Sequence, residues 1–521
     1  MADVHTAAGY VPPIAGDTLP RAWAAHFESA PGRPMLFEER RGWVTAGELD
    51  RATRRVAARL AGAGLRAGDR ILMSAATSIE LVEAHIAALR LGLVVVPANI
   101  AYREREIAHL VRDAMPRAAV VDEPDRAEWI RRANGEGPLV GRSPARVVVV
   151  GPDVDLPDAP GRPPVLDAAG PEDPAIIGYT SGTTGTPKGA VLSHRNLLAS
   201  SDSVRQAWRW TDSDRLVLAL PLFHIHGLGV GLQGTLLAGA SAVLLPRFDP
   251  DAVLDAVAAH DATLFFGVPT MYARLSASPR LQELRRLRLC VSGSAPLPPA
   301  VFEQLAERSG QRILERYGMT ETGMNVSNPY DGERRPGTVG FPLPGVELRL
   351  GDRETGAVPP ATATGTASDR GEVLLRGPNV FGGYWHLPEA TAAAFTEDGW
   401  FRTGDIGEHD RDGYLRLVGR ARDLIITGGL NVYPREVEDV LREHPAVADV
   451  AVAGTPDPEW GEAVAAWVVP APTADTPPAG DLIAFAADRL AKFKCPRRVF
   501  LVEALPRNAL GKVLRHELRP D

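Results

Sequence analysis

Residues 180–189 read TSGTTGTPKG and bring three glycines, five hydroxyl-bearing side chains and one lysine into one short stretch. Glycines let backbone N–H groups turn toward an anion, hydroxyl groups donate further hydrogen bonds, and Lys188 supplies positive charge. The stretch follows an apolar run ending at Tyr179 and precedes a helical pattern that begins near His194. A flexible polar turn is the alternative, but such turns rarely have this order. The residues predict a polyphosphate-binding loop, which lacks the Gly-Lys-Ser/Thr ending of a Walker A loop.

The bulk composition limits the classes of protein to consider. With 521 residues the chain is too long for one ordinary core, so we expect two or more domains. A net charge of −8 argues against a nucleic-acid binder. Cys290 and Cys495 form no CxxC pair, so we expect reduced thiols in a cytoplasmic protein. The N-terminus does not resemble a signal peptide, and no stretch approaches the roughly 20 apolar residues of a membrane span.

Short apolar runs alternate with helical patterns along the first three hundred residues. Apolar residues at helical spacing predict helices at 19–30, 46–64, 78–90 and 104–113. The apolar runs predict buried strands at 70–74, 93–97, 118–122, 175–179, 216–220, 242–245, 264–267 and 287–291. This alternation is typical of an α/β architecture with parallel strands.

The pattern changes after a loop rich in Pro, Ala, Thr and Gly at 351–370. Strands are expected at 372–376, 414–418 and 423–427, with a hairpin turn at the sequence DRDG of residues 410–413. The last hundred residues favour helices at 434–443 and 482–490 and strands at 447–453 and 463–469, which suffices for one small α+β domain. We therefore predict two domains, residues 1–420 and 421–521.

Six further blocks follow the loop in a fixed order. They are RYGMTE at 316–321, YW at 384–385, WFRTGD at 400–405, GRARD at 419–423, GGLNVYP at 428–434 and PRNALGK at 506–512. Together with the loop they resemble the motifs of the adenylate-forming superfamily of acyl-CoA synthetases, peptide-synthetase adenylation domains and luciferases. The resemblance covers nearly the whole chain. It implies a large N-terminal domain of stacked α/β subdomains with a small β-barrel-like part, followed by a small mobile C-terminal domain.

The resemblance also implies a reaction and its partners. A small carboxylic acid would attack the α-phosphate of ATP, with Mg²⁺ present, to form an acyl-adenylate that coenzyme A then converts to a thioester. The protein must place the reactants and neutralise the spreading negative charge. Free coenzyme A is the expected acceptor because the chain carries no carrier-protein domain, and an enzyme that serves a separate carrier protein is one alternative. We expect a monomer or homodimer.

Roles for the ATP-binding residues follow from their positions in these motifs. Glu321 corresponds to the magnesium ligand, Thr320 to the α-phosphate contact and Tyr317 to the residue that stacks on adenine. The phosphates would be held by Thr180, Ser181, Gly182, Thr183, Thr184, Gly185 and Lys188. The other predicted nucleotide contacts are Ser294, Ala295, Pro296, Glu315, Arg316, Gly318, Met319, Asp405 and Arg420. Of these, Asp405 would accept hydrogen bonds from both ribose hydroxyls, which suits a carboxylate with two acceptor oxygens.

The C-terminal motifs imply catalytic and conformational roles. Lys512 corresponds to the catalytic lysine of the superfamily, and a flexible cationic side chain can reach the α-phosphate and acid oxygens in the transition state. Arg422 falls at the hinge about which the small domain swings between the adenylating and thioester-forming poses. In the second pose Gly428, Gly429 and Leu430 would line the tunnel for the pantetheine arm.

The acid is predicted from residues near three further segments. His224, in FHIHG at 223–227, corresponds to a catalytic and substrate-contacting position, and zinc is excluded because the HxH pair lacks a third ligand at sensible spacing. Ser292 and Met324 are further substrate candidates. Arg274 ends the block VPTMYAR, where fatty acyl-CoA ligases usually carry apolar residues.

The malonyl-CoA synthetase branch of the superfamily resembles this chain at Arg274 and in three further segments. The segments are SNPYDGERRPG at 327–337, FDP at 248–250 and AKFK at 491–494. We therefore predict ligation of malonate or methylmalonate, with the distal carboxylate paired to Arg274, since a buried guanidinium needs such a partner. The alternatives are a medium-chain or aryl acid ligase in which Arg274 points to solvent, and a non-catalytic adenylate-binding protein.

Overall fold

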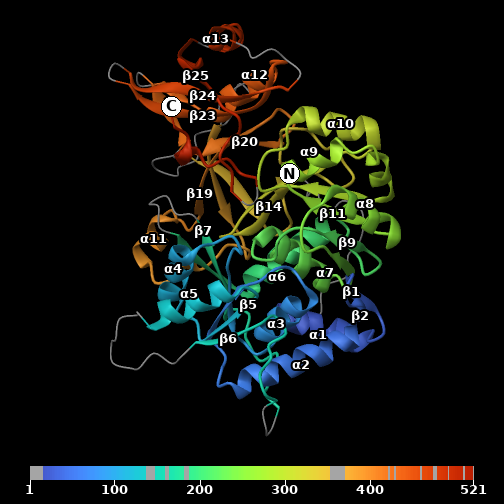
Figure 1. Ribbon diagram of the computed structural model, residues 1–521. Coiled ribbons are helices and arrows are strands. Elements are labelled where there is room, and N and C mark those ends of the chain that lie inside the picture. Colours follow the sequence, from blue (N-terminus) through green and yellow to red (C-terminus); the bar gives the residue numbers. More distant parts are fainter. Residues whose placement is uncertain are drawn as a thin grey trace. The chain divides into compact units, whose positions relative to one another are not determined.

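The computed structural model describes residues 16–135, 147–158, 163–180, 187–351, 370–420, 423–427, 430–457, 460–472, 478–490, 492–508 and 511–519. The chain divides into two compact units, Met1–Glu347 with Arg376–Phe395 and Leu348–Leu375 with Thr396–Asp521 (Figure 1). The domain boundary at residue 420 stays a prediction. None of the helices in the described ranges combines the length and apolar character needed to cross a membrane.

A seven-stranded sheet in the first unit carries the strand that leads into residues 180–189. Its strand order is β18-β8-β7-β4-β3-β5-β6, with parallel pairing from β7 to β6 and antiparallel pairing of β7, β8 and β18. The strands are β3 (Arg70–Ser74), β4 (Val94–Pro97), β5 (Ala118–Val121), β6 (Val148–Val150), β7 (Pro174–Thr180), β8 (Lys188–Ser193) and β18 (Gly383–Tyr384). The associated helices are α3 (Ile79–Arg90), α4 (Glu104–Ala114), α5 (Pro124–Gly135), α6 (His194–Ala207) and α11 (Pro388–Ala393).

A nine-stranded sheet in the same unit carries the RYGMTE block. Its order is β15-β14-β13-β12-β11-β9-β10-β1-β2, with a parallel centre running from β13 to β1. The strands are β1 (Pro34–Glu38), β2 (Gly42–Thr45), β9 (Arg215–Leu218), β10 (Ser241–Leu244), β11 (Leu264–Gly267), β12 (Leu289–Ser292), β13 (Leu314–Met319), β14 (Gly323–Ser327) and β15 (Phe341–Pro342). The remaining helices of the unit are α1 (Leu19–Ser29), α2 (Ala46–Gly62), η1 (His226–Leu232), α7 (Gln233–Leu237), α8 (Pro250–Ala259), α9 (Pro269–Ser276), η2 (Leu281–Arg286) and α10 (Pro299–Ser309).

The second unit contains two smaller sheets. A four-stranded sheet, in the order β16-β17-β19-β20, occupies the part that was expected to resemble a β-barrel. Its strands are β16 (Glu347–Gly351), β17 (Arg370–Arg376), β19 (Phe401–His409) and β20 (Leu415–Arg420). A five-stranded sheet follows, built from β21 (Ile425–Thr427), β22 (Leu430–Val432), β23 (Val447–Asp457), β24 (Gly461–Pro470) and β25 (Arg498–Leu501). It accompanies α12 (Pro434–Arg442), α13 (Ala479–Ala487), η4 (Lys492–Lys494) and η5 (Arg515–Glu517).

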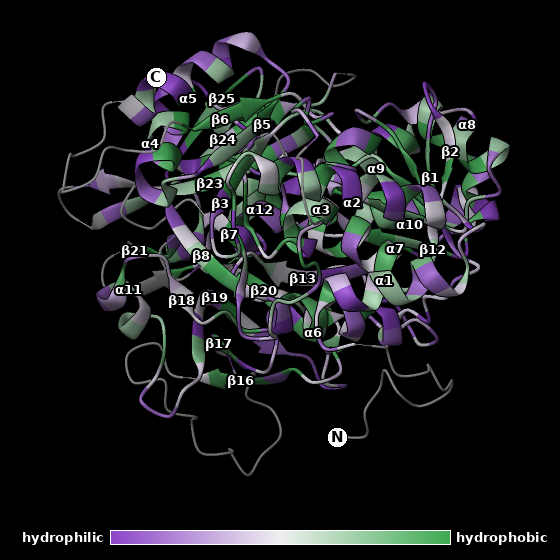
Figure 2. Ribbon diagram, turned by 90° about the horizontal axis from the view of Figure 1, so that it is seen from below, coloured by the Kyte–Doolittle hydropathy of each residue, from purple (hydrophilic) through white to green (hydrophobic). Residues whose placement is uncertain are grey.

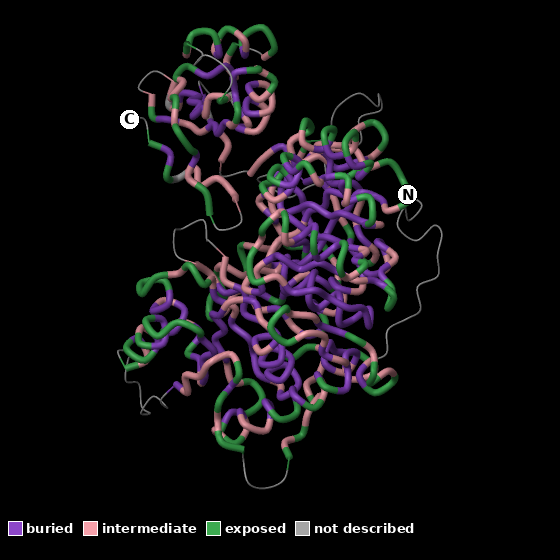
Figure 3. Tube along the Cα trace, turned by 45° about the vertical axis from the view of Figure 1, so that its right-hand side comes forward, coloured by how far each residue is buried: buried purple, intermediate pink, exposed green. Residues whose placement is uncertain are grey.

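The pattern of buried residues explains why these segments form strands and helices. Strands such as β5 are buried on both faces because helices cover parallel sheets, and α4 and α5 pack together against the seven-stranded sheet. Helices α8, α9 and α10 form a second core with the nine-stranded sheet, while α12 and α13 cover the five-stranded sheet. The helices accordingly carry both hydrophilic and hydrophobic residues (Figure 2), and buried segments run through the middle of each unit (Figure 3).

Candidate active site

The two flanks of the phosphate loop are paired strands. Thr180 ends β7 and lies opposite Lys188, the first residue of β8, in an antiparallel register. Strand β8 leads directly into α6, whose start is capped by the Ser193 hydroxyl accepting from the Asn196 N–H at 3.2 Å. The assignments to Ser181, Gly182, Thr183, Thr184 and Gly185 lie outside the described residues and stay predictions. The described flanks thus hold the ends of the loop together.

Tyr384 connects the loop lysine with the predicted metal ligand. Strand β18 pairs with β8, and the Lys188 ammonium lies 5.5 Å from the centre of the Tyr384 ring. The Tyr384 hydroxyl donates a hydrogen bond to Glu321 Oε1 at 3.1 Å, and the Glu321 side chain is buried. The sequence predicted Tyr384 only as a motif member, and its bridging role required the structure. Lys188 and Glu321 are therefore held near one another, as a site for phosphates and their cation requires.

Thr320 packs closely against the strand that leads into the loop. A Cβ atom at Gly178 would lie only 2.5 Å from Thr320 Cγ2, so glycine is required for this approach. Glu321 follows, and its carboxylate suits Mg²⁺, which takes one or two protein oxygens and completes its shell with phosphates and water. Over the described part of the chain, no three His, Cys, Asp or Glu side chains gather as a metal-binding cluster. A magnesium ion held with ATP phosphates fits this donor set, whereas a metal caged by protein alone does not.

Asp405 and Arg420 lie in the second unit as an ion pair. They face each other in the β19–β20 register, with Arg420 Nε 2.9 Å from Asp405 Oδ1. The Asp405 N–H also donates to the Thr403 hydroxyl at 3.0 Å, and the side chain of Asp405 is buried. The two residues predicted to contact the ribose are thus in direct contact with each other.

Lys512 lies on a tight turn near the end of the chain. Its N–H donates to Asn508 Oδ1 and its carbonyl accepts from the Asn508 N–H, both at 2.9 Å. Gly511 adopts φ +76°, in the left-handed region that favours glycine. Arg422, Gly428 and Gly429 lie outside the described residues, and Leu430 begins β22. The predicted roles of these four residues in the hinge and the pantetheine tunnel stay predictions.

The end of β12 carries one of the predicted acid-binding residues, Ser292. Ser292 ends this strand with a fully buried side chain, and its hydroxyl has no hydrogen-bond partner among the described residues. A Cβ atom at the next residue, Gly293, would lie 2.4 Å from Arg316 Cζ, so the guanidinium lies directly against this glycine. The sequence indicated neither the importance of Gly293 nor the position of Arg316 beside Ser292.

Arg316 is a buried cation for which no counter-charge is found among the described residues. The residue is 4% exposed, and neither its Nε nor its Nη2 has a hydrogen-bond partner within the described ranges. Burial lowers the pKa of Arg316 to about 9, which leaves the side chain positively charged at neutral pH. Such a charge is costly unless a carboxylate and hydrogen bonds compensate it.

Arg90 is a buried arginine whose positive charge is compensated by neighbouring side chains. Its side chain is 0% exposed, with Nη1 2.6 Å from Asp50 and Nη2 2.9 Å from Asp167. The Thr53 hydroxyl accepts a further hydrogen bond from Nη1 at 3.1 Å. The contrast indicates that the unpaired state of Arg316 is a property of the site and not of buried arginines in general.

Two histidines lie beside this cation. His226 begins the buried π-helix η1, and its Nδ1 lies 3.3 Å from the Ser294 hydroxyl. Burial lowers the pKa of His226 well below its usual value, and the charge of Arg316 adds to the effect. The His226 N–H donates to Nδ1 of half-buried His224 at 3.2 Å. His226 is therefore neutral and leaves the positive charge to Arg316. Short π-helices often mark functional sites, and sequence reasoning did not identify this one.

Arg274 lies in a different setting from the one that its sequence suggested. The residue is exposed on α9, and its guanidinium stacks over the Phe248 ring at 4.9 Å from the ring centre. This cation–π contact accounts for the pairing of Arg274 with the FDP segment. Arg316, not Arg274, is the arginine that lies against Gly293 at the end of β12.

The other predicted residues lie on strand β13 or next to it. Glu315 braces the backbone, because its two carboxylate oxygens accept the N–H groups of Leu297 and Gly337, each at 3.1 Å. Tyr317 is buried and its hydroxyl donates to Met319 Sδ at 3.7 Å. Met324 is fully buried on β14 and packs against Gly318, where a Cβ would lie 2.3 Å from its Cε. Of the predicted adenine contacts after Gly293, Ser294 and Ala295 are half-buried and Pro296 is exposed.

Comparisons with known proteins identify the family of the chain. The AMP-binding enzyme family matches residues 23–385, and the AMP-binding enzyme C-terminal domain matches residues 436–512. Malonate–CoA ligase of Arabidopsis thaliana is 36% identical over 495 residues, which cover 88% of this chain and 79% of that protein. Feruloyl-CoA synthase of an Amycolatopsis species is 38% identical over 480 residues, which cover 91% and 93% of the two chains.

Among solved structures, ATP-bound MatB from Rhodopseudomonas palustris is similar with a TM-score of 0.87 at 39% identity. The similarity covers 96% of this chain and 98% of that chain. These relatives are named after different acids at similar sequence identity. They therefore show the type of reaction but do not identify the acid that this chain uses. The chain belongs to the AMP-binding enzymes of the adenylate-forming superfamily, as an acid–CoA ligase that works with ATP through an acyl-adenylate.

Proposed function

We propose that this enzyme joins a small dicarboxylic acid, malonate or methylmalonate, to coenzyme A. The observation that carries the proposal is the buried guanidinium of Arg316, which lies against Gly293 and near His226 and has no counter-charge among the described residues. A distal carboxylate would supply the missing counter-charge through charge-assisted hydrogen bonds. The other carboxylate then remains available to attack the α-phosphate of ATP.

A monocarboxylic acid would leave this cation uncompensated. An apolar tail placed against Arg316 would remove any remaining water and supply no acceptor, which disfavours binding. The site thus supports selection for a second negative charge close to the reacting one.

The nucleotide end would use the groups around β7, β8 and β13. Lys188 and the loop would bind the β- and γ-phosphates, and Thr320 would donate to the α-phosphate. Mg²⁺, held by Glu321 with Tyr384 orienting the carboxylate, would neutralise charge on the phosphates. These groups act by positioning and by electrostatic stabilisation, which is what phosphoryl chemistry requires of a protein.

The remaining roles rest on the resemblance of the motifs. Asp405 and Arg420 would bind the ribose, Tyr317 would stack on adenine, and Lys512 would stabilise the charge that develops during adenylation. A hinge at Arg422 and a tunnel at residues 428–430 would serve thioester formation. We also propose a domain boundary near residue 420, a monomeric or homodimeric state and a cytoplasmic location.

An aryl acid ligase is the second candidate, because a feruloyl-CoA synthase is among the relatives. The deciding experiment measures AMP release with ATP, Mg²⁺, CoA and a panel of malonate, methylmalonate, propionate, octanoate and ferulate. The proposal expects the two dicarboxylates to have the highest kcat/KM. Higher values with ferulate or octanoate would refute it. A parallel assay without CoA but with a carrier protein tests the carrier-dependent alternative.

Variants of the two arginines refine the test. Arg274→Ala should leave the preference for malonate over propionate intact, because its guanidinium packs on Phe248 at an exposed position. A selective loss of malonate turnover in this variant would return the role of carboxylate partner to Arg274.

A further inference from the structure

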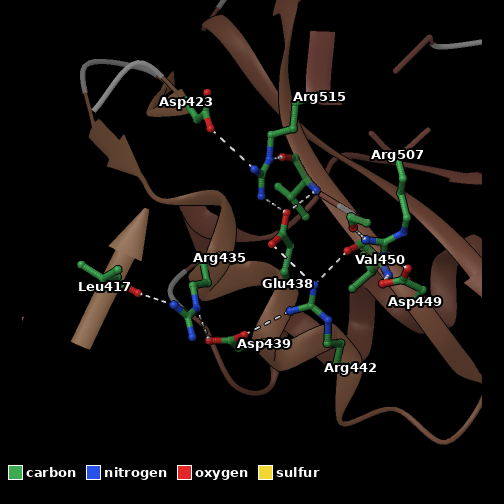
Figure 4. Close-up of polar contacts among 12 residues, drawn as sticks. Leu417, Asp423, Arg435, Glu438, Asp439, Arg442, Asp449, Val450, Arg507 and Arg515 are labelled. Carbon is green, nitrogen blue, oxygen red and sulfur yellow. Dashed lines mark hydrogen bonds and ion pairs between the residues drawn. The ribbon is translucent and has the colours of Figure 1, made fainter. Parts of the chain in front are cut away.

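The turn that carries Lys512 is fastened to the body of the second unit on both sides. Before the turn, Arg507 forms an ion pair with Asp449 on β23 and donates to the Gly511 carbonyl. After the turn, Arg515 forms an ion pair with Glu438 on α12 at 2.6 Å (Figure 4). Each anchor lies within five residues of Lys512, so both can determine where the lysine is presented.

Glu438 is the centre of the second anchor. Its side chain is 6% exposed, and Oε1 accepts from Arg515 Nη2 at 2.6 Å and from the Val452 N–H at 2.9 Å. Arg442 adds a second positive charge 3.6 Å from Oε2. A buried carboxylate with this set of partners fixes a single geometry, because loss of any partner would leave a buried charge uncompensated.

Arg515 contacts more than Glu438. Its Nε donates to the Val452 carbonyl at 3.1 Å, and its Nη1 lies 3.5 Å from Asp423 Oδ2 (Figure 4). Asp423 directly follows Arg422, at which the resemblance places the hinge. One guanidinium therefore links helix α12, strand β23 and the hinge-flanking residue to the segment that carries Lys512.

We propose that Glu438 and Arg515 are positioning residues for Lys512, which hold its turn in the geometry required for adenylation. This inference rests on the role of Lys512 given under the proposed function. Neither residue is among those predicted to contact a reactant. Their effect acts through the backbone of residues 511–515, in which the Leu514 N–H also donates to the Pro506 carbonyl at 2.8 Å and closes the turn.

The two half-reactions allow a test that separates positioning from folding. Adenylation is measured as malonate-dependent exchange of pyrophosphate into ATP without CoA, and thioester formation is measured from supplied malonyl-adenylate and CoA. Lys512→Ala is measured first and should abolish only the exchange. Equal loss of both half-reactions in this variant would refute the role of Lys512 itself, whatever the anchors do.

The anchor variants are then compared on the same scale. Glu438→Gln and Arg515→Met should slow pyrophosphate exchange at least tenfold with less than a threefold change in thioester formation, and Arg515→Lys should recover part of the loss. The surface variant Arg507→Met should also slow pyrophosphate exchange more than thioester formation, but by a smaller factor. Because Arg507 is exposed, this variant can be measured even if the buried variants do not fold. Glu443→Gln, which alters the exposed Arg489–Glu443 pair in the same unit, should change neither half-reaction.

Two results would overturn the inference. Equal slowing of both half-reactions by the anchor variants would mean that they only disturb folding of the second unit. Unchanged exchange in folded Arg515→Met and Arg507→Met proteins would mean that the turn presents Lys512 without these anchors.

Discussion

Replacing Arg316 with methionine should raise the stability of the enzyme while it destroys the preference for a dicarboxylic acid. In the free enzyme the guanidinium is buried, charged and unpaired among the described residues. Methionine has a similar length, carries no charge and adapts to irregular cavities. The substitution therefore removes a group that disfavours the folded state in the absence of substrate, but also the partner for the distal carboxylate.

The expected magnitudes have opposite signs for stability and for activity. Replacing buried charges by apolar residues of similar volume changes stability by about 0 to +4 kcal/mol. Removing one partner of a buried ion pair costs about 3–5 kcal/mol, which corresponds to a fall of about 10²- to 10⁴-fold in kcat/KM for malonate. Propionate, which has no distal charge, should be used as well as before or better.

Arg90→Met is the matched control for this experiment. This arginine is equally buried but is paired with Asp50 and Asp167, so its removal deprives both carboxylates of a buried partner, although Asp50 keeps its ion pair with Arg54. We expect Arg90→Met to lower the melting temperature and to leave the ratio of malonate to propionate turnover unchanged. The assays are thermal unfolding without substrate and AMP release with each acid.

One outcome would refute the reasoning. If Arg316→Met lowers the melting temperature as Arg90→Met does and keeps the preference for malonate, then Arg316 is structural and the acid is selected elsewhere.

Three further predictions concern other parts of the molecule. Tyr384→Phe should raise the Mg²⁺ concentration for half-maximal activity about tenfold, because a hydrogen bond to a carboxylate contributes about 1.5 kcal/mol; an unchanged Mg²⁺ titration would contradict the orienting role of its bond to Glu321. Gly178→Ala should slow pyrophosphate exchange at least tenfold by displacing Thr320, and Thr320→Ser should restore part of the rate because it removes the clashing methyl group; a double variant no faster than Gly178→Ala would exclude this cause. Burial opposes the charged form of Glu438, but Arg515 and Arg442 hold its pKa below the usual value, so its stabilising contribution is present above about pH 4.3 and is lost as the pH falls through the lowered pKa. The difference in urea midpoint between wild type and Glu438→Gln should therefore be largest near pH 6 and shrink below pH 4, and a difference independent of pH would contradict this account.

Local sequence patterns predicted most of the described elements. Apolar runs such as 118–122 became buried strands because parallel strands covered by helices need nearly continuous hydrophobic sequence. The turn at 410–413 formed as predicted, with the Gly413 N–H donating to the Asp410 carbonyl at 3.0 Å between β19 and β20. The antiparallel strand β8 was not predicted, because the residues after the loop were interpreted only as the approach to α6.

The sequence predicted what chemistry the site residues could perform, but it did not predict which residues contact one another. Motif order alone predicted the roles of Glu321, Asp405 and Lys512, which stay predictions. The choice between Arg274 and Arg316 could not be made from the sequence, because the direction and burial of an arginine depend on tertiary packing. The signal that distinguishes them is Gly293, whose missing side chain makes room for one guanidinium and not the other.

Strand β13 has a consequence for the size of acid that the enzyme can use. Arg316 lies on this strand and Thr320 follows directly after it, so at about 3.3 Å per residue their Cα atoms are separated by about 13 Å of extended chain. Residues 316–319 pair with β14, with one register shift between Tyr317 and Gly318, and this pairing restrains the separation. In the proposed function, this separation would fix the distance between the groups that hold the distal carboxylate and the α-phosphate. A longer diacid such as succinate would then have to bend between them, whereas a methyl branch leaves the length of the acid unchanged.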